Sequence, residues 1–179
     1  MKKLQFIFFP IFFLCFALGH AQNTQGKMDD KGRLTLAVWI PDQIENFPSA
    51  ARNNLENKLN QIILRNGLGG NGFNNRFIIS AKVAVLTKDI TATAPPMQAY
   101  TLDVTFYIGD GYEGKSFSSY SQTAKGVGEN ETKAYMNAMK NIKLDDPGFQ
   151  PFIEKGKTKI IEYFNTQCDF IIKEAKTLE

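Results

Sequence analysis

The sequence predicts an α+β fold, in which a four-stranded mixed or antiparallel sheet carries its helices mainly on one face. Two observations predict this class. Four segments alternate apolar and polar residues with the period of a strand, and three others place apolar residues at helical spacing. The order along the chain is β-α-β-β-β-α-α, without an internal repeat. We expect a single domain over residues 33–179.

The first two elements are a strand and an amphipathic helix. Residues 33–40 alternate apolar side chains onto one face until Pro41 ends the strand. Residues 48–66 form the helix, because Pro48 suits the entry turn and Asn66-Gly67 offers a left-handed stop. Its apolar stripe consists of Ala51, Leu55, Leu59, Ile62 and Ile63.

Three further strands follow a Gly/Asn-rich loop at 67–75. Residues 76–87 and 99–108 alternate strongly, and Ala94-Pro95-Pro96 interrupts the connection between them. Residues 115–125 are rich in serine and have few core-facing side chains, so they predict an edge strand.

Two helices end the chain. Asn130 can cap a helix over residues 131–143. Asp146-Pro147 then opens a longer helix with proline at its first position, and Gly156 is a point where that helix could bend. Its apolar stripe consists of Phe149, Phe152, Ile153, Ile160, Phe164, Cys168, Ile171 and Ala175.

The N-terminus has the three parts of a secretory signal peptide. Lys2 and Lys3 precede an apolar run from Phe6 to Leu18, which is shorter than the roughly 20 residues of a membrane-spanning helix. Small residues precede a cleavage point after Ala21. We therefore expect residues 1–21 to be removed and residues 22–32 to form a flexible polar leader. After cleavage we expect no transmembrane segment, with the protein in the periplasm or outer envelope.

Removal of the signal peptide excludes several kinds of catalytic and metal site. It takes away His20, the only histidine, and Cys15, and the loss of Lys2 and Lys3 lowers the net charge from +3 to +1. We therefore expect no histidine-dependent catalysis, no histidine-ligated metal and no nucleic-acid partner. The remaining Cys168 has no intramolecular disulfide partner and is typical of a buried thiol.

Several motifs have structural interpretations that fit better than catalytic ones. The glycines of 67–72 match the spacing of a dinucleotide-binding loop, but they follow a helix and precede a strand, the reverse of what a dinucleotide site needs. Gly126-Val127-Gly128 is expected to be a tight strand-to-helix connection. The serines of 116–121 lack a lysine or histidine base, and Asp145/Asp146 suit helix entry. We predict no catalytic residue, cofactor or metal.

Aromatic side chains on a sheet face or edge are candidates for binding a protein or a sugar ring. Burial beneath the helices is the alternative for each of them. The candidate binding residues are Trp39, Tyr112, Phe117 and Tyr120.

The strand-Gly-Val-Gly-helix segment at 121–142, with Ala134 and Ala138, resembles a group of bacterial envelope domains. The group includes LPP20-type lipoproteins, the amino-terminal domain of TolB and the curli-secretion lipoprotein. The composition and the signal peptide also resemble uncharacterised exported proteins of Bacteroidota. The resemblance spans about residues 33–143, brings no catalytic residue, and implies an envelope-associated interaction domain.

Three functions remain open from the sequence. The leading hypothesis is a non-enzymatic envelope module that binds a protein partner, with the 115–125 edge accepting a partner strand. The alternative is a binder of small molecules or glycans that uses the 67–75 loop and nearby aromatics. A carboxylate-based hydrolase would need two acidic side chains facing one pocket.

Overall fold

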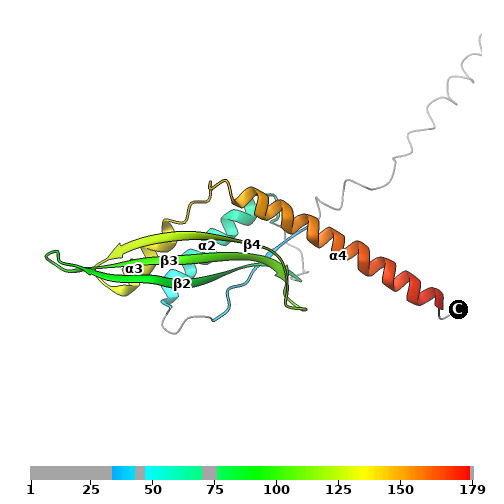
Figure 1. The fold of residues 1–179 in the computed structure, drawn as a ribbon, viewed down its shortest axis with the longest axis horizontal. Coiled ribbons are helices and arrows are strands. Elements are labelled where there is room, and N and C mark those ends of the chain that lie inside the picture. The colour runs from blue at the N-terminus through cyan, green and yellow to red at the C-terminus, as the bar shows by residue number, and fades with distance from the viewer. Residues whose placement is uncertain (1–33, 43–46, 70–75, 178–179) are drawn as a thin grey trace, which may run out of the picture.

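The computed structural model describes residues 34–42, 47–69 and 76–177 (Figure 1), with side chains placed up to Gln167. The predicted signal peptide and leader, and most of the 67–75 loop, lie outside the described residues. The described part forms one sheet with helices packed against it, which confirms the α+β class.

The sheet is mixed and has the strand order β1-β2-β3-β4. Its strands are Ala37–Val38, Phe77–Thr91, Met97–Asp110 and Lys115–Gly128. β1 is parallel to β2, whereas β2, β3 and β4 form antiparallel pairs. β4 lies at an edge, as the serine-rich sequence predicted.

All four strands differ in length from the prediction. β1 is short because the Leu36 amide donates to the carbonyl of Leu68 rather than to β2 (3.1 Å). β2 and β3 are longer, since their pairing continues to Thr91 and Met97. There the Thr91 hydroxyl donates to the Met97 carbonyl (3.1 Å) and closes the hairpin.

The helices are α2 (Ser49–Arg65), α3 (Glu131–Lys140) and α4 (Phe149–Thr177). The end signals act as predicted: Gly67 has a φ of 65°, and the Asn130 side chain accepts the Lys133 amide at 2.9 Å. α4 begins at Phe149 rather than at Pro147, because the Asp146 carboxylate first accepts the Gly148 amide in a turn (2.9 Å).

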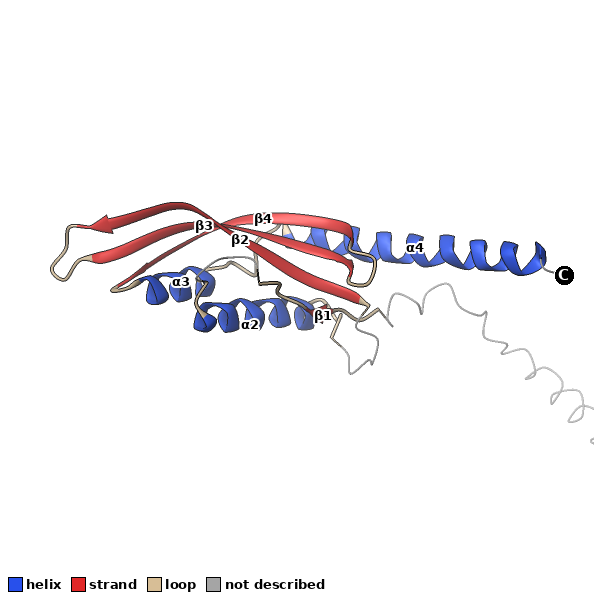
Figure 2. Cartoon of the chain, turned by 90° about the horizontal axis from the view of Figure 1, so that it is seen from below, coloured by secondary structure: helices blue, strands red, loops and turns tan. Residues whose placement is uncertain are grey.

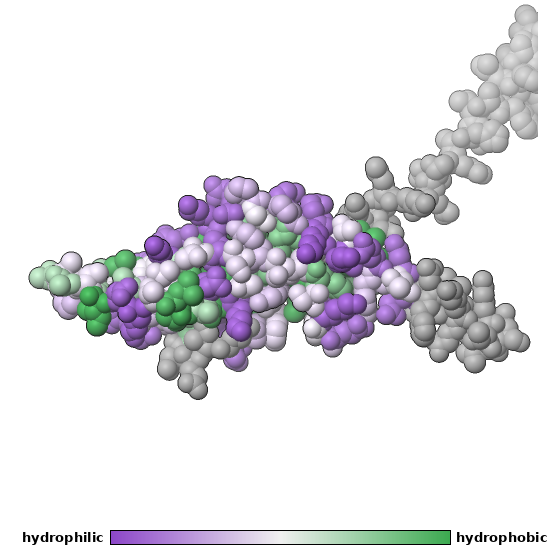
Figure 3. All heavy atoms as spheres, in the orientation of Figure 1, coloured by the Kyte–Doolittle hydropathy of each residue, from purple (hydrophilic) through white to green (hydrophobic). Residues whose placement is uncertain are grey.

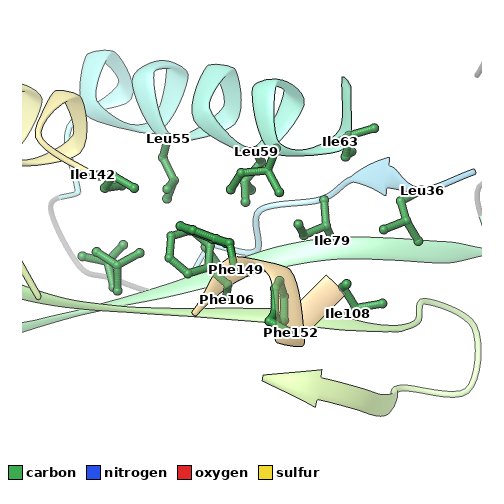
Figure 4. Close-up of a cluster of buried hydrophobic side chains, with 14 of the residues drawn as sticks. Leu36, Leu55, Leu59, Ile63, Ile79, Phe106, Ile108, Ile142, Phe149 and Phe152 are labelled. Atoms are coloured by element: carbon green, nitrogen blue, oxygen red, sulfur yellow. The ribbon is translucent and has the colours of Figure 1, made fainter. Parts of the chain in front are cut away.

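All three helices contact the same face of the sheet (Figure 2). α2 and α3 lie under its middle, and α4 crosses β4 and then runs beyond the end of the sheet. The core between them is apolar (Figure 4) and includes Leu36, Leu55, Leu59, Ile63, Ile79, Phe106, Ile108, Ile142, Phe149 and Phe152.

Glycines set how closely the helices approach the sheet. A Cβ at Gly126 would lie 2.1 Å from the Ala134 carbonyl oxygen and 2.3 Å from the Ala138 nitrogen. The Gly-Val-Gly segment is therefore the end of β4, on which α3 packs directly, rather than a turn. Gly156 has a similar role: its Cβ would lie 2.7 Å from Ile108 Cδ1, and α4 continues unbroken through it. A bend of this continuous helix at Gly156 stays a prediction.

Candidate interaction surface

The β2–β3 hairpin extends past α3 as an arm, which we define as residues 84–98 (Figure 1). Apolar side chains remain exposed on it: Val85 is 43% exposed, Leu86 56% and Ile90 72%. Hydrophobic atoms gather at this end of the molecule (Figure 3). Such clustering is typical of an interaction surface, whereas single exposed apolar residues are normal.

No described residue pairs with the outer edge of β2 along the arm. The β1–β2 register ends at Val38 and Ile79. Among the described residues, the Trp39 amide makes the last backbone hydrogen bond to this edge, to the Ile79 carbonyl (3.0 Å). All residues from 84 to 90 are exposed. Leu86 is the extra residue of a register shift between Val85 and Thr87. An exposed strand edge of this kind is a template for pairing with another chain.

The β4 edge, which the sequence favoured for strand addition, is partly occupied by the protein itself. The side-chain amides of Asn137 and Asn141 donate to the carbonyls of Val127 and Lys125, each at 2.8 Å. Further along, Gln122 accepts the Lys143 amide (2.9 Å). These contacts fold α3 and its following loop over the edge, so β2 offers the more open edge.

The four predicted aromatic residues separate into two pairs. Phe117 is buried, and Tyr120 packs against Phe149 with ring centroids 4.9 Å apart. The Tyr120 hydroxyl donates to Asp146 (2.5 Å), and burial together with this bond raises the pKa of Tyr120 to about 12. The expectation that Phe117 and Tyr120 bind at the surface is therefore corrected, because they support the core.

Trp39 and Tyr112 are the exposed pair, at 54% and 77%. Trp39 follows β1, and Tyr112 lies in the turn between β3 and β4. Their role in binding stays a prediction. Nothing in the sequence analysis selected Ile90 or Leu86, although the uncharged run from Ile90 to Tyr100 was a usable signal.

A charged cluster fastens α4 to the end of the sheet. Arg76 donates to the buried carboxylate of Asp110 (2.7 Å) and to the Tyr163 hydroxyl (2.6 Å), and Tyr163 donates to Glu113. Burial of Asp110 opposes its ionisation. Hydrogen bonds from Arg76 and from the Glu113 and Tyr112 amides outweigh it and lower the pKa of Asp110. Each polar group has a partner within the cluster, which is typical of a structural tether.

Acidic residues also meet in a solvent-open recess of about 270 Å³ where α2 ends and α4 begins. Asp145 and Asp146 line it beside Arg65. The Tyr120 hydroxyl and the Gly148 amide hydrogen-bond to Asp146 and lower its pKa. Asp146 thus stabilises the turn before α4 and its contact with β4. Within the described ranges, no group of three or more His, Cys, Asp or Glu residues is placed to hold a metal ion.

No helix within the described residues is both long and apolar enough to cross a membrane.

No protein-family model matches the sequence, and no curated protein matches it. Among solved structures, the chain is similar to a minor lipoprotein of Acinetobacter baumannii, with 17% identity and a TM-score of 0.41 over 70% of this chain and 94% of that one. It is also similar to a protein described as a lipoprotein of Caulobacter crescentus CB15, with 10% identity and a TM-score of 0.34 over 75% and 90%.

A third similar structure is described as a homologue of a neuraminyllactose-binding hemagglutinin from Helicobacter pylori, with 15% identity and a TM-score of 0.39 over 78% of this chain and 96% of that one. The chain thus has distant structural similarity to bacterial lipoproteins. With TM-scores below 0.5, nothing about function follows from these similarities. The likeness to TolB and the Bacteroidota origin stay predictions.

Proposed function

We propose that this protein is a non-enzymatic interaction module of the cell envelope that binds a partner protein through the arm. An extended segment of the partner pairs with the open β2 edge and adds a strand to the sheet. The observation that carries this proposal is the exposure of Val85, Leu86 and Ile90 along a strand edge that β1 leaves unpaired.

Strand addition would use both the unpaired backbone edge of the arm and its exposed apolar side chains. Backbone groups of the open edge gain hydrogen-bond partners, and side chains of the added segment cover the exposed apolar residues. Full burial of a Leu or Ile side chain contributes roughly 1.5–3 kcal/mol, so Leu86 and Ile90 together supply a useful share of a binding free energy. Lys88 and Asp89 lie between them, and charges at an edge restrict which segments can pair.

Site-specific photo-crosslinking in the native envelope tests the proposal. A photoreactive amino acid at Ile90 is compared with the same amino acid at Leu64, which is 70% exposed on α2 and makes a matched apolar control. The expected result is a reproducible protein adduct from position 90 that is absent from position 64. No adduct at 90, or the same adducts from both positions, would refute the proposal.

A second variant separates binding from folding. Leu86→Asp should abolish the adduct formed at position 90 while changing the free energy of unfolding by no more than about 0.5 kcal/mol, because the side chain is exposed. Leu64→Asp is the control and should leave the adduct unchanged. An adduct that survives Leu86→Asp would show that the partner does not bind along this edge.

A further inference from the structure

The sheet face opposite the helices is uncovered within the described residues (Figure 2), and its residues follow from the register. In one row Ser80 pairs with Tyr107, which pairs with Ser119 on β4. In the next row the residues are Lys82, Thr105 and Ser121. The Ser80 side chain is buried, so the face presents the partly exposed Tyr107 ring among the hydroxyls of Thr105, Ser119 and Ser121.

Trp39 adds a second ring to the first of these rows. Val38 and Ile40 pack against the core, so Trp39 between them points to the opposite face of the sheet. Its amide donates to the Ile79 carbonyl (3.0 Å), which places Trp39 beside Ser80. Trp39 and Tyr107 thus stand on either side of Ser80, two strand spacings or about 10 Å apart.

The polar groups next to these rings are already aligned with one another. The Thr105 and Ser121 hydroxyls lie 2.8 Å apart, and the Thr105 hydroxyl donates to the Asp103 carboxylate at 3.1 Å. Lys82 and Asp103 lie in adjacent rows of the same face, so this part of the face carries one charge of each sign. Flat rings beside hydroxyl and carboxylate groups match a ligand that has an apolar face and a hydroxyl-bearing edge.

We propose that this strip, defined as Trp39, Tyr107, Thr105 and Ser121, binds a neutral pyranose sugar. The apolar face of the sugar ring stacks on Trp39 or Tyr107, and its hydroxyls bond to Thr105, Ser121 and Asp103. The strip uses different residues from the arm and does not depend on the proposed partner protein. It also does not use the 67–75 loop that the sequence favoured for glycan binding.

Tryptophan fluorescence tests the proposal directly, because Trp39 is the only tryptophan of the chain. The full chain is titrated with the neutral oligosaccharides chitotriose and maltotriose, and with a sulfated heparin disaccharide as the anionic comparison. A saturable change in Trp39 emission at millimolar concentrations of a neutral sugar is expected. No saturable change with either neutral sugar, or a response to the sulfated sugar alone, would overturn the proposal.

Variants locate the binding site. Tyr107→Ala should weaken binding tenfold or more, and the near-isosteric Thr105→Val should weaken it while preserving the fold. Tyr112→Ala is the control, since Tyr112 is exposed but lies in the β3–β4 turn. Unchanged affinity in both Tyr107→Ala and Thr105→Val would overturn the assignment. Ile90→Asp should leave sugar binding intact, which separates this result from a failure of the arm.

Discussion

Replacing Gly126 with alanine should destabilise the protein strongly. The new Cβ would lie 2.1 Å from the Ala134 carbonyl oxygen and 2.3 Å from the Ala138 nitrogen, whereas ordinary contacts begin at 3.4 Å. These are backbone atoms, so no rotamer change relieves the overlap and α3 must move away by about 1 Å. Overpacking of a core costs about 1–3 kcal/mol, and we expect the upper end of that range.

Urea and thermal denaturation followed by circular dichroism measure this effect. A loss of about 3 kcal/mol corresponds to a melting temperature lower by about 6–12 °C for a domain of this size. Val127→Ala is the matched control on the neighbouring residue, whose side chain is exposed, and it should change stability by about 0.5 kcal/mol or less. If the free energy of unfolding of Gly126→Ala is within about 0.5 kcal/mol of the wild-type value, α3 does not pack on β4 as described.

Three other perturbations test separate contacts. Tyr120 should ionise near pH 12 in an ultraviolet titration, because burial and its hydrogen bond to Asp146 raise its pKa to about 12, and a midpoint near the ordinary 10.0 would contradict that contact. The pKa of Asp110 is lowered from 3.8, so its contribution to stability is present above that pH and is lost as the pH falls through the folded value. Asp110→Asn should therefore lower the free energy of unfolding in urea at neutral pH, and this variant should lose less stability than the wild type as the pH falls below 3.8. An unchanged pH profile would contradict the role of the carboxylate. Gly156→Val should lower the unfolding free energy by about 2 kcal/mol, since even a Cβ would lie 2.7 Å from Ile108 Cδ1, and an unchanged melting temperature would argue against this close approach.

Much of the fold could be predicted from the sequence because it depends on local signals. Alternation of apolar residues identified the strands, and the caps at Asn130 and Gly67 identified helix ends, since each acts through neighbouring backbone groups. The sequence marks the glycines at 126 and 128 but does not reveal their role. Their spacing is compatible with a turn, and only the position of α3 shows that they admit a helix backbone.

The candidate surfaces depended on contacts between distant segments, which periodicity does not contain. Phe117 and Trp39 are both aromatic residues on strands or beside them, yet α4 buries the first and no described helix covers the second. The sequence also could not show that Asn137 and Asn141 would occupy the β4 edge while β2 stayed open.

The sequence by itself therefore determined the elements, their order and the apolar face of each, because these follow from nearest-neighbour stereochemistry and from burial of one face. The tertiary structure alone decided which edge is open and which aromatic rings reach the surface. It also decided that Trp39 and Tyr107 share a row on the uncovered face. These properties depend on strand order and helix position, which are set by packing between residues far apart in the chain.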